Sequence, residues 1–423
     1  MAQMDATFGD VMRSADGTPL KVSLARAMRR RKITALLLVA PLFIFILFTF
    51  LIPIVEMTYR SVENSLVSEI LHRTTPLLQE WDDSTGELPS EATFAAIVAD
   101  FKQGREDRTI GRVGTRLNYE VAGMSSLFRK TARAVRKMEE PPFKEALIKV
   151  DKDWGDVDTW RLIKRESGAF TLSYYLAALD MRYNHQGEIV AQPDDRQIYV
   201  QLFVRTLWLS LLITVLCLVL GFPISYLLAT LPLKTSNLLM IMVLLPFWTS
   251  LLVRTTSWIV LLQSEGVLND ILVWLGLVSD DNRLQLIHNQ MGTIIAMTHI
   301  LLPFMVLPLY SVMKTIPPSY MRAAMSLGAN PVRAFIRVYL PQTVPGIGAG
   351  SILVFILAIG YYITPALVGG TSGTLIGNFI AYHMQVSLNW GLAAALGALL
   401  LVAVLFLYWL YNRIVGIDNM KLG

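Results

Sequence analysis

Six long, largely apolar runs constrain the fold of this chain more than any other feature of its sequence. They cover residues 33–54, 206–229, 238–262, 292–312, 346–367 and 391–411. A helix of about 20 apolar residues crosses the hydrocarbon core of a bilayer, where a single segment can satisfy its own backbone hydrogen bonds only as a helix. The composition agrees, because only 16% of the residues are charged and 54% are hydrophobic. The sequence therefore predicts an all-α polytopic membrane protein with six transmembrane helices.

The first run follows a basic cluster, as the apolar core of a signal peptide also does. Such a core spans about 7–15 residues and ends at a small-residue cleavage site. The run at residues 33–54 is longer than that and ends beside Pro53 and Glu56. We therefore expect a retained first helix, preceded by a cytoplasmic segment at residues 1–32, with Glu56 as an interfacial charge.

The positions of lysine and arginine predict the orientation, because short cytoplasmic loops are enriched in these residues. With the N-terminus inside, the short inner segments contain 14 of them and the short outer segments contain one, Arg283. Both termini, including a tail at residues 412–423, are therefore expected in the cytoplasm. The net charge of +5 is explained by these loops, and no nucleic-acid partner is expected.

Residues 60–200 separate the first two runs and contain no spanning segment. Five helices are expected there. They are one capped by Ser90 ahead of apolar positions 94, 97, 98 and 101, one each at 126–138 and 143–150, one around 160–163 closed by Gly168, and one at 172–181. Long domains cross the membrane regardless of charge, so the sequence predicts a periplasmic helical insert.

The helix expected at 126–138 is strongly basic. Its cations are Arg129, Lys130, Arg133, Arg136 and Lys137. A solvated face is the commoner explanation for such a pattern, while binding to lipid head groups or to a docked partner stays open. A regulatory or docking role for the whole insert also stays open, and deletion of residues 65–165 would test it.

The connection between the fourth and fifth runs, residues 313–345, has the most distinctive local pattern. Two prolines precede Ser319, which is well placed to cap a short helix, and Gly328 would end that helix in the left-handed conformation. A second amphipathic helix is predicted over residues 331–340, stopped by Pro341. Such a pair of helices either seats in a groove of a partner or simply joins two spans.

This connection resembles the EAA loop of ABC importer permeases. The resemblance is carried by Ala323, Ala324, Leu327, Gly328, Ala329, Leu340 and Pro341, and by the run Pro345, Gly346 and Ile347. Over about 220 residues the chain is most similar to the spermidine/putrescine branch of the type I importers, with further matching segments at 246–254, 266–269, 362–370 and 389–390. It departs from that branch at Arg322, which stands where the family has a glutamate, and in the large insert.

The resemblance implies the type I permease fold for a core at residues 206–411, and a channel subunit of an ATP-driven, binding-protein-dependent importer in a bacterial inner membrane. The implied partners are a cytoplasmic ATPase dimer, a second and different permease subunit, and a periplasmic substrate-binding protein. The implied solute is a polyamine or a related small nitrogenous compound. Ser319, Arg322 and the loop residues that carry the resemblance would form the contact with the ATPase.

No enzyme activity, catalytic residue, metal site or cofactor is expected in this chain, because the sequence has no G-x-x-x-x-G-K-[ST] phosphate loop and a single cysteine, Cys217. ATP and Mg²⁺ would bind the partner ATPase. The scattered histidines, among them His72 and His185, make no paired ligand motif.

Candidate residues for lining the solute pathway are Trp248, Thr249, Arg254, Tyr361, Tyr362 and Pro365. Arg254 is a functional candidate because it is ionisable at membrane depth, although an arginine near a helix end also extends to the interface. The two tyrosines offer aromatic faces to an ammonium group, and an irregular helix between Gly360 and Pro365 would face a cavity. Trp258 is expected to be an interface anchor.

A transporter or channel driven by an ion gradient, without an ATPase, is the alternative from another functional class. It predicts internal repeats and charged residues near mid-membrane. The sequence shows no clear repeat and Arg254 as the one charge inside a span, which favours the importer.

Overall fold

The structure is a computed structural model that describes residues 20–184 and 186–415, so most of the expected cytoplasmic segment 1–32 and of the tail 412–423 lies outside the described residues. The chain divides into two compact units, Met1–Tyr59 and Arg60–Gly423. The first unit contains α1 (Leu20–Ile46), a π-helical turn η1 (Leu47–Leu51) and the start of α2 (Ile52–Arg60). They follow one another without a break, and the segment Arg31–Arg60 is long and apolar enough to cross a membrane. This segment contains the first predicted span.

The insert is mainly helical, as the sequence predicts. Its helices are α3 (Leu66–Ile70), α4 (Thr74–Glu80), α5 (Glu91–Glu106), α6 (Ile110–Asn118), α7 (Met124–Ala134), α8 (Phe143–Val150), α9 (Val157–Glu166) and α10 (Ser173–Ala178). The prediction is wrong beyond Ala178, where the antiparallel strands β1 (Met181–Tyr183) and β2 (Ile189–Ala191) pair with Met181 opposite Ala191. Ser90 occupies the N-cap of α5 but makes no side-chain cap bond. Gly168 is not left-handed, and α9 already ends at Glu166.

Aromatic side chains form the centre of the insert. Its largest fully buried side chains are Trp154, Trp160, Phe94, Phe101 and Phe128. Their ring centroids lie 4.6–6.0 Å apart in tilted and edge-on pairs. The indole nitrogens are also satisfied, since Trp154 donates to Thr131 Oγ1 at 2.8 Å and Trp160 to the Trp154 carbonyl at 3.0 Å. The insert is therefore a packed domain with its own core.

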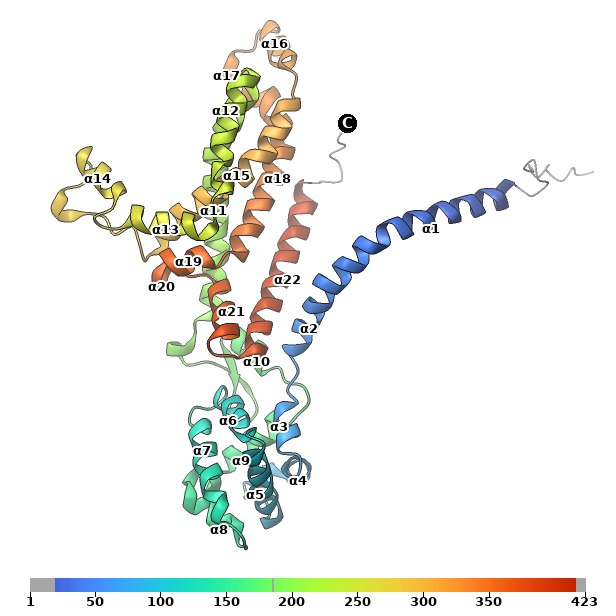
Figure 1. The fold of residues 1–423 in the computed structure, drawn as a ribbon, viewed down its shortest axis with the longest axis vertical. Helices are drawn as coiled ribbons and strands as arrows, with labels where there is room; N and C mark the ends of the chain where they lie inside the picture. The colour runs from blue at the N-terminus through green and yellow to red at the C-terminus, as the bar shows by residue number, and fades with distance from the viewer. Residues whose placement is uncertain (1–19, 185, 416–423) are drawn as a thin grey trace, which may run out of the picture. The chain divides into compact units, whose positions relative to one another are not determined.

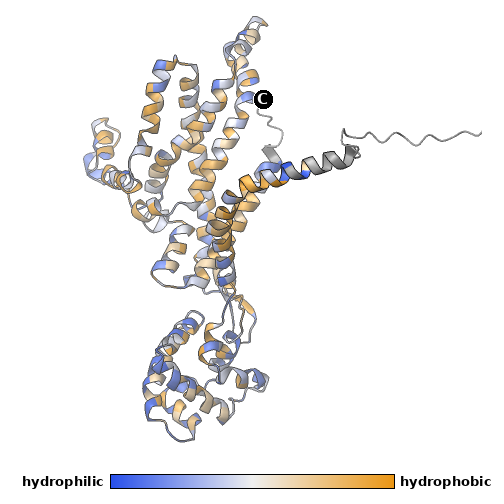
Figure 2. Cartoon of the chain, turned by 45° about the vertical axis from the view of Figure 1, so that its right-hand side comes forward, coloured by the Kyte–Doolittle hydropathy of each residue, from blue (hydrophilic) through white to orange (hydrophobic). Residues whose placement is uncertain are grey.

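Three long helices pack together to form the membrane core. They are α11 (Tyr199–Thr230), α15 (Gln290–Thr315) and α18 (Leu340–Gly360), with α22 (Trp390–Val415) beside α18 (Figure 1). Glycines allow the close contact, because a Cβ at Gly221 or Gly350 would meet the Met305 side chain within 3.1 Å. Figure 2 shows these helices coloured mainly as hydrophobic and the insert as mixed.

The third predicted span, residues 238–262, is broken. α12 (Leu233–Leu244) and the 3₁₀ turn η6 (Leu245–Trp248) are followed by α13 (Leu251–Leu262) and α14 (Val267–Trp274), and the two halves meet at 97°. Ser250 starts the second half, because its side chain accepts a hydrogen bond from the Val253 N–H at 3.2 Å. Five helices are long and apolar enough to span, or six if this pair counts as one, so the six-helix count stays a prediction.

The fifth span also departs from the prediction of a run at residues 346–367. One helix extends from Pro331 to Gly360, through α17 (Pro331–Ala334) and the π-helical turn η8 (Phe335–Tyr339) into α18. Pro341 does not stop it, because the wider turn pairs the Leu340 N–H with the Phe335 carbonyl and so places Pro341 in the first turn of α18. The helix ends at Gly360, and the chain continues in α19 (Ile363–Val368), α20 (Gly370–Gly373) and α21 (Ile376–Gln385).

Truncation of the insert core gives the first prediction. Trp154→Ala removes a fully buried indole and leaves a cavity, so we expect the insert to lose about 3–5 kcal/mol of unfolding free energy. This loss is measured by heating the detergent-solubilised chain and detecting unfolding of the insert as proteolytic cleavage between residues 60 and 200. Trp274→Ala is the control, because that side chain is 83% exposed and its removal should leave the insert unchanged. Equal protease resistance of the two variants would contradict the assignment of Trp154 to the core.

Candidate functional site

The two breaks in the membrane core meet beside α15. α13 contacts both α15 and α19, the short helix that follows the interruption at Tyr361 and Tyr362. Thr255 Oγ1 lies 3.2 Å from Thr364 Oγ1, and both side chains are fully buried. The Tyr362 carbonyl accepts a hydrogen bond from Asn378 Nδ2 at 2.7 Å. The interrupted backbone therefore finds partners inside the protein, as it must at membrane depth.

A polar group of side chains lies at this junction. Trp258 Nε1 donates to His299 Nδ1 at 3.2 Å, with their ring centroids 5.2 Å apart. Arg254 is close enough to act electrostatically on His299 and Tyr361. Its Nε is enclosed and has no hydrogen-bond partner among the described residues. The role of Trp258 as an interface anchor stays a prediction. Sequence reasoning missed its partner His299, whose signal was a histidine inside an apolar run.

The other pathway candidates are dispersed. Trp248 is 87% exposed, and Thr249 donates back to the Pro246 carbonyl at 2.9 Å. Tyr362 is 40% exposed, whereas Pro365 is buried within α19. Of the six candidates, the structure therefore places Arg254 and Tyr361 within electrostatic range of each other.

The coupling loop, residues 313–345, begins with α16 (Pro318–Ser326). Ser319 is not its cap: Pro317 occupies the N-cap, and Pro318, with its φ locked near the helical value, begins the helix. The prediction for Gly328 is confirmed, since its φ is +90°. The Gly328 N–H bonds to the Met325 carbonyl at 3.0 Å and the Ala329 N–H to the Ala324 carbonyl at 3.1 Å, which is the Schellman motif.

α16 has no buried residue, and apart from Met321, which packs against the membrane core, its side chains are available to a partner. Arg322 and Ala323 are exposed, Ala324 is half-buried, and Leu327 is 89% exposed. Tyr320, Met325 and Val332 add further exposed apolar surface. Leu340 and Pro341, also predicted for this contact, lie at the start of α18.

The end of the coupling loop is fixed to the membrane core by stacked aromatic rings. Phe335 and Tyr339 stack at 5.4 Å, and Tyr226 of α11 contacts both edge-on, at 5.6 and 5.3 Å. Because η8 continues into α18, a displacement of the loop would reach α11 and α18 together.

The insert joins the other end of the membrane core at α21 and α22. A Cβ on Gly391, in the first turn of α22, would overlap the ring of Tyr174 from α10. Tyr119 donates to the Ser387 carbonyl at 3.1 Å, and Tyr199 Oη lies 2.8 Å from His383 Nε2. His383 Nδ1 in turn lies 2.8 Å from Ser387 Oγ. We call these contacts the insert clamp.

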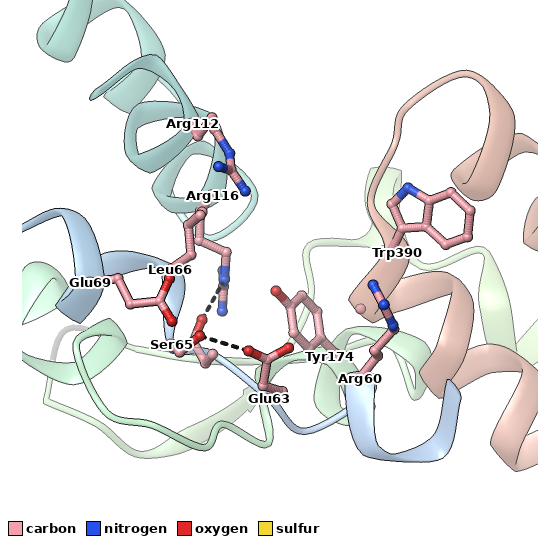
Figure 3. Close-up of a pocket in the computed structure, with 11 residues that line it drawn as sticks. Arg60, Glu63, Ser65, Leu66, Glu69, Arg112, Arg116, Tyr174 and Trp390 are labelled. Atoms are coloured by element: carbon pink, nitrogen blue, oxygen red, sulfur yellow. Dashed lines mark hydrogen bonds between the residues drawn. The ribbon is translucent and has the colours of Figure 1, made fainter. Parts of the chain in front are cut away.

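A polar pocket of about 280 Å³ lies beside the insert clamp. Figure 3 shows Arg112 and Arg116 on one side of it and Arg60 and Trp390 on the other, with Tyr174 between them. Charges of both signs line it, because Glu63 and Glu69 also contribute. The lining therefore has no single sign of charge that would select a cation or an anion.

Arg116 connects the pocket to a buried ion-pair network. Its guanidinium donates to Glu166 Oε2 at 2.6 Å and to Glu120 Oε1 at 2.8 Å. It also lies 4.7 Å from the centroid of the Tyr174 ring. Burial, reinforced by repulsion from Glu166, raises the pKa of Glu120 above its ordinary value although Arg116 opposes the shift. The network thus supports Tyr174, which forms the insert clamp with Gly391.

Comparison with known proteins matches residues 195–415 to the family described as "Binding-protein-dependent transport system inner membrane component". The Spermidine/putrescine transport system permease protein PotB of Escherichia coli (strain K12) is 36% identical over 222 residues, 52% of this chain and 80% of that protein. The inner membrane ABC transporter permease protein YdcU of the same organism is 33% identical over 227 residues, 51% of this chain and 71% of that protein. A bacterial ABC transporter for the import of alginate overlaps 54% of this chain and 82% of its own, at 21% identity and a TM-score of 0.44.

The insert clamp gives the second prediction. Gly391→Ala places a Cβ inside the Tyr174 ring, so we expect a destabilisation of about 1–3 kcal/mol from overpacking. Gly397→Ala is the matched control in the same helix, because a Cβ there meets nothing within 4 Å. The thermal unfolding of both variants, and of each combined with Tyr174→Ala, measures the effect. Removing the ring should make the two glycine variants equally stable. If Gly391→Ala still lowered the thermal stability in the Tyr174→Ala background, its effect would not come from contact with that ring.

Proposed function

The chain belongs to the family of binding-protein-dependent transport system inner membrane components, and we propose that it moves polyamines such as spermidine or putrescine across the membrane. The assignment of the substrate class rests on the 36% identity to the spermidine/putrescine permease over 80% of that protein. Within this family the chain is a permease subunit of an importer, not a transporter driven by an ion gradient alone. Hydrolysis of ATP, with Mg²⁺, would take place on a partner subunit.

The coupling loop is the proposed contact with that ATPase. An exposed helix with small and apolar residues, closed by a rigid Schellman turn, can seat in a groove of a partner. Arg322 replaces the glutamate that the family has here, so the facing groove would differ locally in charge. The aromatic stack of Tyr226, Phe335 and Tyr339 would transmit movement of the loop to α11 and α18.

The remaining assembly follows from the same proposal. The coupling loop and both termini would face the cytoplasm of a bacterium, and the insert would lie on the outer side of the inner membrane. A second, different permease subunit would complete the channel, and an external binding protein would deliver the solute. Alternating access would be controlled at the junction of the broken helices, where Arg254, His299 and Tyr361 lie together.

The coupling loop yields the third prediction. Gly328→Val forces a branched side chain into left-handed backbone, at a cost of about 1–2 kcal/mol, and should unfold the turn that presents α16. We expect the ATPase to co-purify with the wild type and to be lost from the variant. Gly276→Val is a matched control: Gly276 has φ +70°, ends α14 with the same pair of hydrogen bonds and also has nothing within 4 Å of its Cβ. Loss of the ATPase from both variants would indicate general misfolding.

The substrate class yields the fourth prediction. Cells that lack their own polyamine importers but produce this chain with its ATPase, partner permease and binding protein should accumulate radiolabelled spermidine. Excess unlabelled putrescine should reduce that uptake, and the Gly328→Val variant should abolish it. ATP-dependent uptake of another nitrogenous solute that spermidine does not inhibit would refute the polyamine assignment while leaving the importer intact.

A further inference from the structure

Helix α7 and the 3₁₀ turn η3 (Val135–Lys137) that continues it have two contrasting faces. One face is part of the insert core, with Met124, Leu127, Phe128, Thr131 and Val135 buried. The other carries five exposed cations and no acid, and these are Arg129, Lys130, Arg133, Arg136 and Lys137. We call this second surface the basic face of α7.

Few of these charges are neutralised by the chain itself. Lys130 pairs with Asp151 Oδ2 at 2.7 Å. Arg129 and Arg133 donate only to backbone carbonyls of their own helix, those of Ser125 and Arg129, at 3.0 and 3.3 Å. Among the described residues no ion pair joins Arg129, Arg133, Arg136 or Lys137 to an acid. Some other cations of the insert, such as Arg116 and Lys164, are paired with acids. Arg129, Arg133, Arg136 and Lys137 therefore present positive charge together on one helix face.

The basic face is held rigidly and lies away from the spans. Phe128 belongs to the aromatic core, with its ring centroid 5.0 Å from that of Phe101, so the helix cannot turn independently. Within this unit α7 and α8 lie beyond α6 and α10, on the side of the insert away from α22 (Figure 1). Lipid head groups would be met close to the spans, so this position favours a soluble partner over a membrane surface.

The expected partner follows from the charge of the basic face. A concentrated row of arginines and lysines attracts an acidic protein surface, and the family description names a binding protein as the soluble component on which such importers depend. We propose that the basic face of α7 is a docking surface for an acidic face of the soluble binding protein on which this family of importers depends. This inference rests on the proposed function, because it takes both the external location of the insert and the polyamine class from it.

Such a surface would act mainly on the rate of encounter. Charged patches at the rim of an interface accelerate association and lose their effect as salt increases. The binding energy would then reach the membrane core through the insert clamp, where the Tyr174 ring packs on Gly391 of α22.

The test compares two double charge reversals in the full importer complex reconstituted in nanodiscs. Arg133→Glu/Arg136→Glu reverses the basic face. Lys102→Glu/Arg105→Glu is the matched control, because it makes the same charge change at the same spacing and Arg105, like Arg133, lies in the last turn of its helix. Stopped-flow binding of the fluorescently labelled binding protein is measured at low and at physiological salt, together with ATPase stimulation.

We expect the basic-face variant to associate about tenfold more slowly than the control at low salt, with the difference shrinking at physiological salt. Equal association rates for the two variants would overturn the inference, whereas a wild-type complex with no stimulation by any polyamine-binding protein would overturn the proposed function instead. Binding to vesicles with and without anionic lipid is measured in parallel. A basic-face variant that loses only vesicle binding would identify the surface as a lipid site and also overturn the inference.

Discussion

The requirement that backbone polar groups inside a bilayer find partners within the protein governs the rest of this structure. Five long helices of the described residues meet it internally, but the chain is interrupted at residues 249–250 and at 361–362. At the first interruption Ser250 accepts from the Val253 N–H and Thr249 donates to the Pro246 carbonyl. At the second, Asn378 donates to the Tyr362 carbonyl. The first interruption is satisfied by its own neighbours, whereas the second takes a partner from α21. The Thr255–Thr364 contact adds a link between α13 and α19, so polar groups gather in an otherwise apolar core.

The membrane core is held at both ends by aromatic contacts of different kinds. On the coupling-loop side, Tyr226 meets Phe335 and Tyr339 edge-on, which fixes a π-helical turn to α11. On the insert side, the Tyr174 ring lies directly on the backbone of Gly391. Closely packed elements move between discrete arrangements and do not deform continuously. Helices α11, α18 and α22 can therefore carry a displacement from either end to the junction around Arg254 and His299.

The sequence contained enough information for the first, second, fourth and sixth apolar runs, for the helical insert and for the turn at Gly328. Each of these depends on a local pattern: apolar length, helical periodicity, or a glycine ahead of a proline. It did not reveal the 97° break, since residues 238–262 remain apolar on both sides of it. Pro341 was misread as a stop because a π-helical turn, which depends on tertiary contacts of Phe335 and Tyr339, accommodates it. His299 was missed for a related reason: its importance comes from Trp258 and Arg254, which are distant in sequence and meet it only in the fold.

The polar group at the junction bears on where a polyamine importer would discriminate between solutes. Arg254 has an enclosed Nε and lies near Tyr361, so a cation held there would experience repulsion in a low-dielectric surrounding. Strong binding of a polycation at this depth would therefore be unfavourable, and in the proposed importer the affinity would come from a binding protein that presents carboxylates. A pathway that binds its solute weakly also releases it readily to the inner side. Selectivity for a polyamine would then be set before the solute enters this chain, and the permease would contribute a conformational switch.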